Sequence, residues 1–203
     1  MTTKRPPGVF CLEGEWEESI ESRLSIEPAL RLLEARDDIR LVHRDIATLA
    51  ELEYYLDRWL NTRLRGYDFG YLGFHGSAER LDVGHEQMSL DDLAELIDGR
   101  CQGKVVYFGS CSVLSAPDEV LTSFCRRTGA RAVAGYTKNV DWIETAAFEL
   151  LLVTKLVYST NMKPAYTSLC KTYPDMTRRL GFRMAHSAWA SDRNIAVQAS
   201  HST

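Results

Sequence analysis

Short β-favouring runs alternate with longer runs of helical periodicity along most of this chain. The β runs are rich in Val, Leu, Phe and Tyr and fall at 9–12, 39–43, 67–74, 104–108, 131–136 and 181–185. Strands separated by helices in this way form βαβ units, whose parallel sheet is covered on both faces. The sequence therefore predicts an α/β fold: a three-layer sandwich with a mostly parallel central sheet of about six strands.

Several helical segments carry their own start signals. Thr48 and Glu51 form a capping-box pair, and so do Ser89 and Asp92 at the start of a later helix. The segment 79–88 alternates only weakly and predicts a hairpin or an irregular loop. These signals place polar loops directly after the strands, where open α/β sheets bind their ligands.

Length, charge and cysteine usage narrow the class of protein. The chain has 203 residues, which predicts one domain over 1–190 and a flexible polar tail over 191–203. A net charge of −4 gives no basic field for nucleic acid, and no apolar run is long enough to span a membrane. The five cysteines are scattered without a CxxC pair, so we expect a cytoplasmic protein with free thiols and neither metal nor cofactor.

Two chemically reactive side chains follow neighbouring strands of the predicted sheet. His75 follows the strand at 67–74, and Cys111 follows the strand at 104–108. If these strands pair, the imidazole and the thiol emerge side by side at one edge of the sheet. An imidazole can take the proton of a thiol and later protonate a leaving amine, so the pair predicts nucleophilic catalysis with Cys111 as nucleophile and His75 as base.

The neighbouring residues suggest the rest of such a site. Acyl transfer needs donors for the developing oxyanion, and we expect the backbone N–H groups of Gly76 and Cys111 to supply them. A substrate groove is expected along the loops that follow the strands. Its candidate residues are Ser110, Asn139, Asp141 and Trp142; for the last three, a polar turn that caps the next helix is an equal alternative.

The element order, with Phe74-His75-Gly76 after one strand and Gly109-Ser110-Cys111-Ser112 after the next, resembles the caspase-like cysteine peptidases of clan CD. Within them it is most similar to the bacterial CHAT and separase-like branch. The resemblance implies a caspase-like fold and a cysteine endopeptidase that cleaves polypeptides through a thioester on Cys111, with His75 as general base and acid. It also implies a protein or peptide substrate and a separate regulatory or sensor protein as partner.

Two departures from the family keep other interpretations open. Ser110 stands where the caspase signature has Ala, and no acidic or basic specificity pocket is visible in the sequence. A catalytically inactive caspase-like module that binds protein partners is therefore the alternative. A flavodoxin- or receiver-like domain is a weaker third interpretation, because Glu13-Gly14-Glu15 lacks the Gly, Ser or Thr residues of a phosphate-binding loop.

Overall fold

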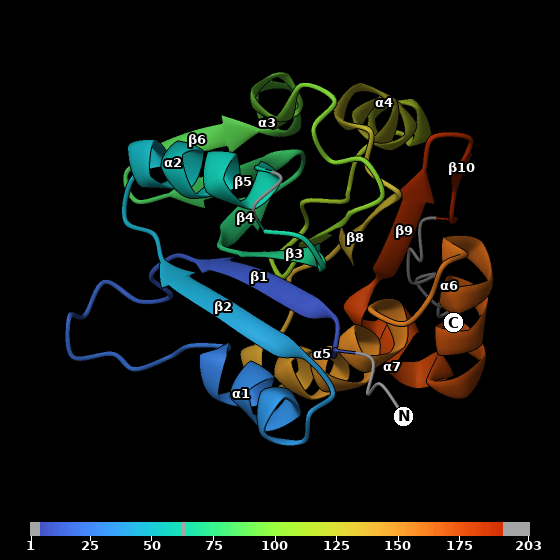
Figure 1. The fold of residues 1–203 in the computed structure, drawn as a ribbon, viewed down its shortest axis with the longest axis horizontal. Helices are drawn as coiled ribbons and strands as arrows, with labels where there is room; N and C mark the ends of the chain where they lie inside the picture. The colour runs from blue at the N-terminus through green and yellow to red at the C-terminus, as the bar shows by residue number, and fades with distance from the viewer. Residues whose placement is uncertain (1–4, 62–63, 193–203) are drawn as a thin grey trace, which may run out of the picture.

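The computed structural model describes residues 5–61 and 64–192. A seven-stranded sheet lies at its centre, with the strands in the order β10-β9-β8-β7-β3-β1-β2 (Figure 1). The five strands from β8 to β2 are mutually parallel, whereas β9 runs antiparallel to β8 and β10 runs antiparallel to β9. The strands are β1 (Gly8–Glu13), β2 (Arg40–Asp45), β3 (Tyr67–Gly73), β7 (Val105–Phe108), β8 (Ala132–Tyr136), β9 (Phe182–His186) and β10 (Trp189–Ala190).

Helices cover both faces of this sheet, as the sequence predicted (Figure 1). One face carries α2 (Leu49–Leu60), α3 (Leu90–Ile97) and α4 (Asp118–Thr128), and the other carries α1 (Glu27–Ala35), α5 (Trp142–Leu156), α6 (Met162–Thr172) and α7 (Pro174–Leu180). Alternate residues of each strand enter the two cores. In β1, Phe10 packs with the α2 side and Val9 with the α1 side. The three-layer α/β sandwich is therefore confirmed.

Side-chain caps stabilise the first turns of the helices that border the sheet edge. The Thr48 side chain accepts from the Glu51 N–H at the start of α2, and Ser89 and Asp92 form a complete capping box at the start of α3. The Asp141 carboxylate accepts from the Glu144 N–H and caps α5. Each cap fixes the point at which a loop after a strand turns into a helix.

A small second sheet occupies the segment for which a hairpin or an irregular loop was expected. It contains β4 (His75–Ser77), β5 (Arg80–Val83) and β6 (Glu86–Ser89), all antiparallel. Its apolar residues Leu81, Val83 and Met88 join the core on the α2 side. His75 is the first residue of β4 and pairs with Asp82 of β5, so its backbone belongs to this small sheet directly after β3.

The C-terminal part differs from the expected architecture in two details. The strand expected at 181–185 is present as β9, but the two-residue β10 follows it and was too short to give a sequence pattern. Ser191, where we placed the start of the tail, is buried and its N–H donates to the Met184 carbonyl. Residues 193–203 lie outside the described residues, so the flexible tail stays a prediction. Among the helices described, none has the length and apolar character needed to cross a membrane.

Candidate active site

His75 and Cys111 lie at the same edge of the sheet because their strands are neighbours. Strands β3 and β7 pair in parallel, with Leu72 opposite Phe108. His75 and Cys111 each follow these paired residues by three positions. Both line one cavity of about 240 Å³ beyond the strand ends. The structure thus places both residues at one cavity, and their pairing as a catalytic dyad stays a prediction.

Gly76 allows the His75 segment to lie directly against the Cys111 backbone. A Cβ atom at Gly76 would lie 2.6 Å from Val113 Cγ2 and 3.0 Å from the Cys111 carbonyl oxygen, too close for any side chain. Within the described part of the chain, the Cys111 N–H donates no hydrogen bond. Gly76 and Cys111, the predicted oxyanion donors, are therefore adjacent, and one of their N–H groups is available to a ligand.

The His75 imidazole is oriented by a backbone carbonyl. Its Nε2 lies 2.9 Å from the Trp16 carbonyl oxygen, and the Trp16 ring packs edge-on against the imidazole at 5.5 Å between centroids. A carbonyl oxygen can only accept, so Nε2 must carry a proton in this bond. In neutral imidazole the other nitrogen, Nδ1, is then the acceptor. His75 therefore has the Nε2–H tautomer, and among the described residues none is recorded as a hydrogen-bond partner of Nδ1.

Cys111 occupies a turn that differs from the surroundings of the other cysteines. The thiol is half-buried, and the Val140 N–H points at Sγ from 3.4 Å. The next residue, Ser112, has φ +56°, a left-handed conformation that costs a non-glycine residue about 1 kcal/mol. Burial raises the pKa of Cys101 and of Cys125 to about 12, so these thiols are unreactive at neutral pH.

The four predicted groove residues have different positions. Trp142 lines the cavity beside Cys111. Ser110 is buried; its hydroxyl accepts from the Phe74 N–H at 3.1 Å and donates to the Leu72 carbonyl, so it ties β3 to β7 and does not line a groove. Asn139 accepts from the Ser112 hydroxyl at 2.9 Å. Asp141 caps α5, which gives its carboxylate a structural role.

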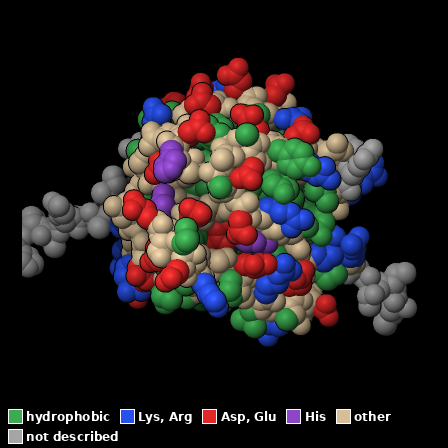
Figure 2. Space-filling model, turned by 90° about the vertical axis from the view of Figure 1, so that its left-hand side faces the viewer, with side chains coloured by type: hydrophobic (Ala, Val, Ile, Leu, Met, Phe, Trp, Pro, Cys, Tyr) green, Lys and Arg blue, Asp and Glu red, His purple; other side chains and the backbone are tan. Residues whose placement is uncertain are grey.

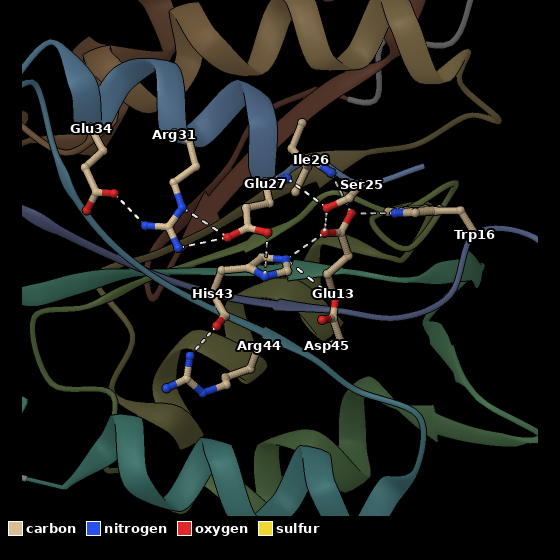
Figure 3. Close-up of polar contacts among 10 residues, drawn as sticks. All are labelled: Glu13, Trp16, Ser25, Ile26, Glu27, Arg31, Glu34, His43, Arg44 and Asp45. Carbon is tan, nitrogen blue, oxygen red and sulfur yellow. Dashed lines mark hydrogen bonds and ion pairs between the residues drawn. The ribbon is translucent and has the colours of Figure 1, made fainter. Parts of the chain in front are cut away.

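A buried carboxylate holds the loop that carries Trp16. Glu13, at the end of β1, is 2% exposed and accepts four hydrogen bonds (Figure 3). The donors are the Trp16 indole at 2.5 Å, the Ser25 hydroxyl at 2.6 Å, the Ile26 N–H at 2.7 Å and His43 Nε2 at 2.8 Å. The first donor lies at the start of the loop and the next two at its end. Glu13 thereby fixes both ends of the segment whose carbonyl orients His75.

His43 and Glu13 form a buried ion pair. Burial alone would raise the pKa of Glu13, but the bonds from His43, Ser25, Trp16 and Ile26 outweigh it and lower that pKa. Burial likewise lowers the pKa of His43, but the Glu13 carboxylate outweighs it and the net shift is upward. The second ring nitrogen, Nδ1, lies 3.6 Å from a Glu27 oxygen (Figure 3). Carboxylates on both sides of the ring favour the imidazolium form.

Among the described residues, Glu13, His43 and Asp45 of the same cluster come close enough together to hold a metal ion. The ligand atoms of Glu13, His43 and Asp45 lie within 4.8 Å of one another. Each Glu13 oxygen already accepts two hydrogen bonds, which uses its lone pairs. Glu13 is therefore committed to protein donors and is not suited to binding a metal.

A second buried carboxylate lies at the cavity beside Cys111. Glu149 of α5 is 2% exposed and lines that cavity. Tyr71 donates to its Oε2 at 2.7 Å, whereas Tyr107 and Tyr136 donate to Oε1 at 2.8 and 3.3 Å. Burial raises the pKa of Glu149 to about 7, although the three tyrosine hydroxyls oppose this rise. The cavity thus contains an acid that changes its charge near neutral pH.

Arg183 of β9 holds the segment that follows Cys111. Its guanidinium is fully buried and donates to the carbonyls of Leu114 at 2.8 Å and Ala116 at 2.5 Å. It also pairs with Asp118 and donates to the Ser191 carbonyl. The Cys111 loop is therefore attached to the last long strand of the sheet.

Sequence reasoning missed Trp16, Glu13, Glu149 and Arg183. Their partners lie far away in sequence: Tyr71 and Glu149 are separated by 78 positions, and Arg183 and Leu114 by 69. One signal was available. Glu149 interrupts an otherwise apolar helix, and an acid on a buried helix face needs partners from elsewhere in the fold.

The edge that carries the site has an acidic surface. Figure 2 faces the side toward which β2 points in Figure 1, and acidic side chains are spread across it with histidines among them. A second groove of about 820 Å³ shares Trp16, Glu17 and His75 with the first cavity. Its carboxylates come from Glu15, Glu17, Glu18 and Asp82, and no Lys or Arg is among its described lining residues.

Comparison with known proteins gives a family and a fold. The profile of a family described as "Family of unknown function (DUF6642)" matches residues 7–186. No curated protein matches the sequence. The crystal structure of caspase-1 from Spodoptera frugiperda is similar, with a TM-score of 0.53 at 12% identity, over 82% of this chain and 76% of that chain. This likeness shows that the chain has a caspase-like fold.

Proposed function

The chain belongs to DUF6642, a family of unknown function, and on this premise we propose that it is a cysteine endopeptidase. The observation that carries the proposal is the shared cavity of His75 and Cys111 at the ends of two paired strands. The fixed Nε2–H tautomer of His75 and the adjacent backbone of Gly76 add support. The finer placement in the CHAT and separase-like branch rests on the order of the sequence motifs.

The proposed reaction uses only groups that this chain supplies. His75 Nδ1 takes the Cys111 proton, and the sulfur attacks the carbonyl carbon of the scissile peptide bond. The negative charge on the carbonyl oxygen is met by the Cys111 N–H and the backbone of Gly76. As the C–N bond breaks, His75 gives its proton to the leaving amine, and a thioester remains. Water, deprotonated by His75, hydrolyses the thioester, which releases the new carboxyl group and restores the thiol.

A covalent trap tests this proposal, and the chain contains its own control. Cys170 is also half-buried, but nothing described around it resembles the Cys111 site. A peptidyl acyloxymethyl ketone should label Cys111 only, whereas iodoacetamide should label both thiols. His75→Ala should abolish the peptidyl labelling of Cys111 and leave the iodoacetamide labelling of Cys170 unchanged. Peptidyl labelling at Cys170 or Cys125 would contradict the proposal.

The alternative, a catalytically inactive module that binds partners, predicts a different result. A peptide library should be cleaved by the native protein, and Cys111→Ala should remove that cleavage while the unfolding temperature stays within a few degrees. If no peptide is cleaved and every cellular phenotype survives Cys111→Ala, the binding module becomes the better interpretation.

A further inference from the structure

The cavity beside Cys111 has the chemistry of a specificity pocket. We infer that it receives the side chain of an arginine or lysine that precedes the cleaved bond, with Glu149 as the residue that selects the positive charge. This inference rests on the proposed peptidase function, because it concerns the same site.

The position of the cavity decides which substrate residue it can hold. It lies against Cys111 and His75 and is also lined by Gly109, two residues before the nucleophile. When Cys111 attacks the carbonyl carbon of the cleaved bond, the side chain of the substrate residue before that bond lies next to the sulfur. A cavity in this place therefore accommodates that side chain.

The acidic side chains of the cavity are Glu149 and Glu17, and its described lining contains no Lys or Arg. Burial raises the pKa of Glu149 to about 7, so above that pH its carboxylate is negative with no Lys or Arg beside it in the described lining. Glu149 is buried, and its Oε2 accepts one described hydrogen bond, from Tyr71. A buried carboxylate without a cation is costly, and a cationic ligand would remove this cost while using the second lone pair of Oε2. An aspartate or glutamate in the cavity would meet two like charges.

The walls of the cavity suit a long basic side chain. Trp16, Tyr71 and Trp142 supply aromatic surface, and Leu24, Ile26 and Val140 supply aliphatic surface. Arginine and lysine bury an apolar stem and carry their charge at the tip, and a guanidinium also stacks on aromatic faces. The second, acidic groove, which shares Trp16 and His75 with this cavity, would attract a peptide with further basic residues.

A ligand competition tests the pocket without any need for peptidase activity. Benzamidine carries a planar cation, and benzamide has nearly the same shape without the charge. At millimolar concentration, benzamidine should slow the alkylation of Cys111 by iodoacetamide, whereas benzamide should not. Alkylation of Cys170 should be unaffected by either compound. Glu149→Gln should weaken the protection by at least about 10-fold, since the charged partner is lost.

Two variants make this result specific. Glu144→Gln removes a carboxylate from the same helix, but Glu144 is not among the residues that line the cavity, so protection should be unchanged. Glu17→Gln removes the exposed carboxylate at the cavity and should weaken protection by a few-fold. Because Glu17 is exposed, its variant tests the role of charge without changing the buried hydrogen bonds of Glu149. Equal protection by benzamidine and benzamide would overturn the inference.

Peptide cleavage separates this inference from the proposed function. Peptides with Arg or Lys before the cleaved bond should be hydrolysed with a kcat/KM at least about 100-fold above that of the Asp peptide. Cleavage only after neutral or acidic residues would overturn the inference and leave the endopeptidase proposal intact. Protection by benzamidine without cleavage of any peptide would overturn the endopeptidase proposal and leave a cation-binding cavity beside Cys111.

Discussion

The Trp16 carbonyl oxygen accepts a hydrogen bond from His75 Nε2 at 2.9 Å, and the Trp16 indole donates to Glu13 at 2.5 Å. One residue therefore touches the catalytic candidate with its backbone and a buried carboxylate with its side chain. The orientation of His75 depends on how firmly this loop is held, because a carbonyl on a mobile loop would no longer fix the imidazole.

Trp16→Phe should lower kcat about 10-fold and change KM less. The variant keeps the backbone carbonyl and an aromatic ring but loses the indole N–H that bonds Glu13. The measurement is the steady-state hydrolysis of a cleaved peptide. Trp189→Phe, a tryptophan change on β10 far from His75 in sequence, should have no effect on kcat. An unchanged kcat in Trp16→Phe would mean that the loop holds its position without this bond.

Gly76→Ala should reduce kcat/KM by about 100-fold and the free energy of unfolding by about 1–3 kcal/mol. The new Cβ would meet Val113 Cγ2 at 2.6 Å and the Cys111 carbonyl at 3.0 Å, so the segment must move away from the nucleophile. Peptide hydrolysis and denaturant unfolding measure the two effects. Ser77→Ala, one residue later, is the control and should be close to native in both.

Glu13→Gln should lower the free energy of unfolding by about 3–5 kcal/mol. The change leaves the His43 cation without its buried partner, and the Gln amide cannot accept all four donors. Asp45 lies beside the same histidine, but its own side chain is 92% exposed. Asp45→Asn should therefore lower the free energy of unfolding by less than about 0.5 kcal/mol. Similar losses in both variants would show that general charge, not the buried pair, matters here.

The Glu13–His43 pair should stabilise the fold most between pH 4.5 and 6.5, the ordinary pKa values of the two groups. The pKa of Glu13 is lowered on folding, so its contribution is present above pH 4.5 and is lost as the pH falls through the folded value. The pKa of His43 is raised, so its contribution is present below pH 6.5 and is lost as the pH rises through the folded value.

Denaturant unfolding of the native protein and of His43→Gln across pH 3–9 measures this window. The difference in free energy between the two proteins should be largest inside it and should decline on both sides. A difference that is independent of pH would contradict the assignment of charge to His43.

Glu149→Gln should make the protein more stable at pH 8 by about 1–3 kcal/mol. Burial raises the pKa of Glu149 from 4.5 to about 7, so the native fold loses stability as the pH rises through this interval. Gln is neutral throughout and should remove that loss. The check is the change in unfolding free energy between pH 5 and pH 8, which should be smaller in the variant. An equal change in both proteins would place the titration elsewhere.

The sequence predicted those parts of the molecule that depend on local pattern. Strand periodicity located His75 and Cys111 at strand ends, and the rule that ligands bind beyond these ends was enough to bring them together. The same reasoning could not find the residues that orient them. Glu13 precedes Gly14 in what looked like an ordinary acidic turn, and its role appears only when Ser25, Ile26 and His43 surround it.

The expected groove shows a second limit of local pattern. Asp141 and Asn139 are polar residues after a strand, but their hydrogen bonds close a helix cap and a turn. The cavity is instead walled by apolar side chains such as Val140 and Leu24, which a search for polar residues passes over. Glu149, which also lines the cavity, lies within the apolar helix α5. The periodicity of this helix indicates that the residue is buried but not what surrounds it.

The attachment of the Cys111 loop to Arg183 has a consequence for biosynthesis. The guanidinium that grips the carbonyls of Leu114 and Ala116 is translated long after the thiol has left the ribosome. Domains are completed in the order in which their segments emerge, so the nascent polypeptide holds an unanchored sulfur until its last long strand arrives. Completion of the Cys111 loop is thereby coupled to the translation of β9, and a truncated product that lacks β9 would have a disorganised Cys111 loop.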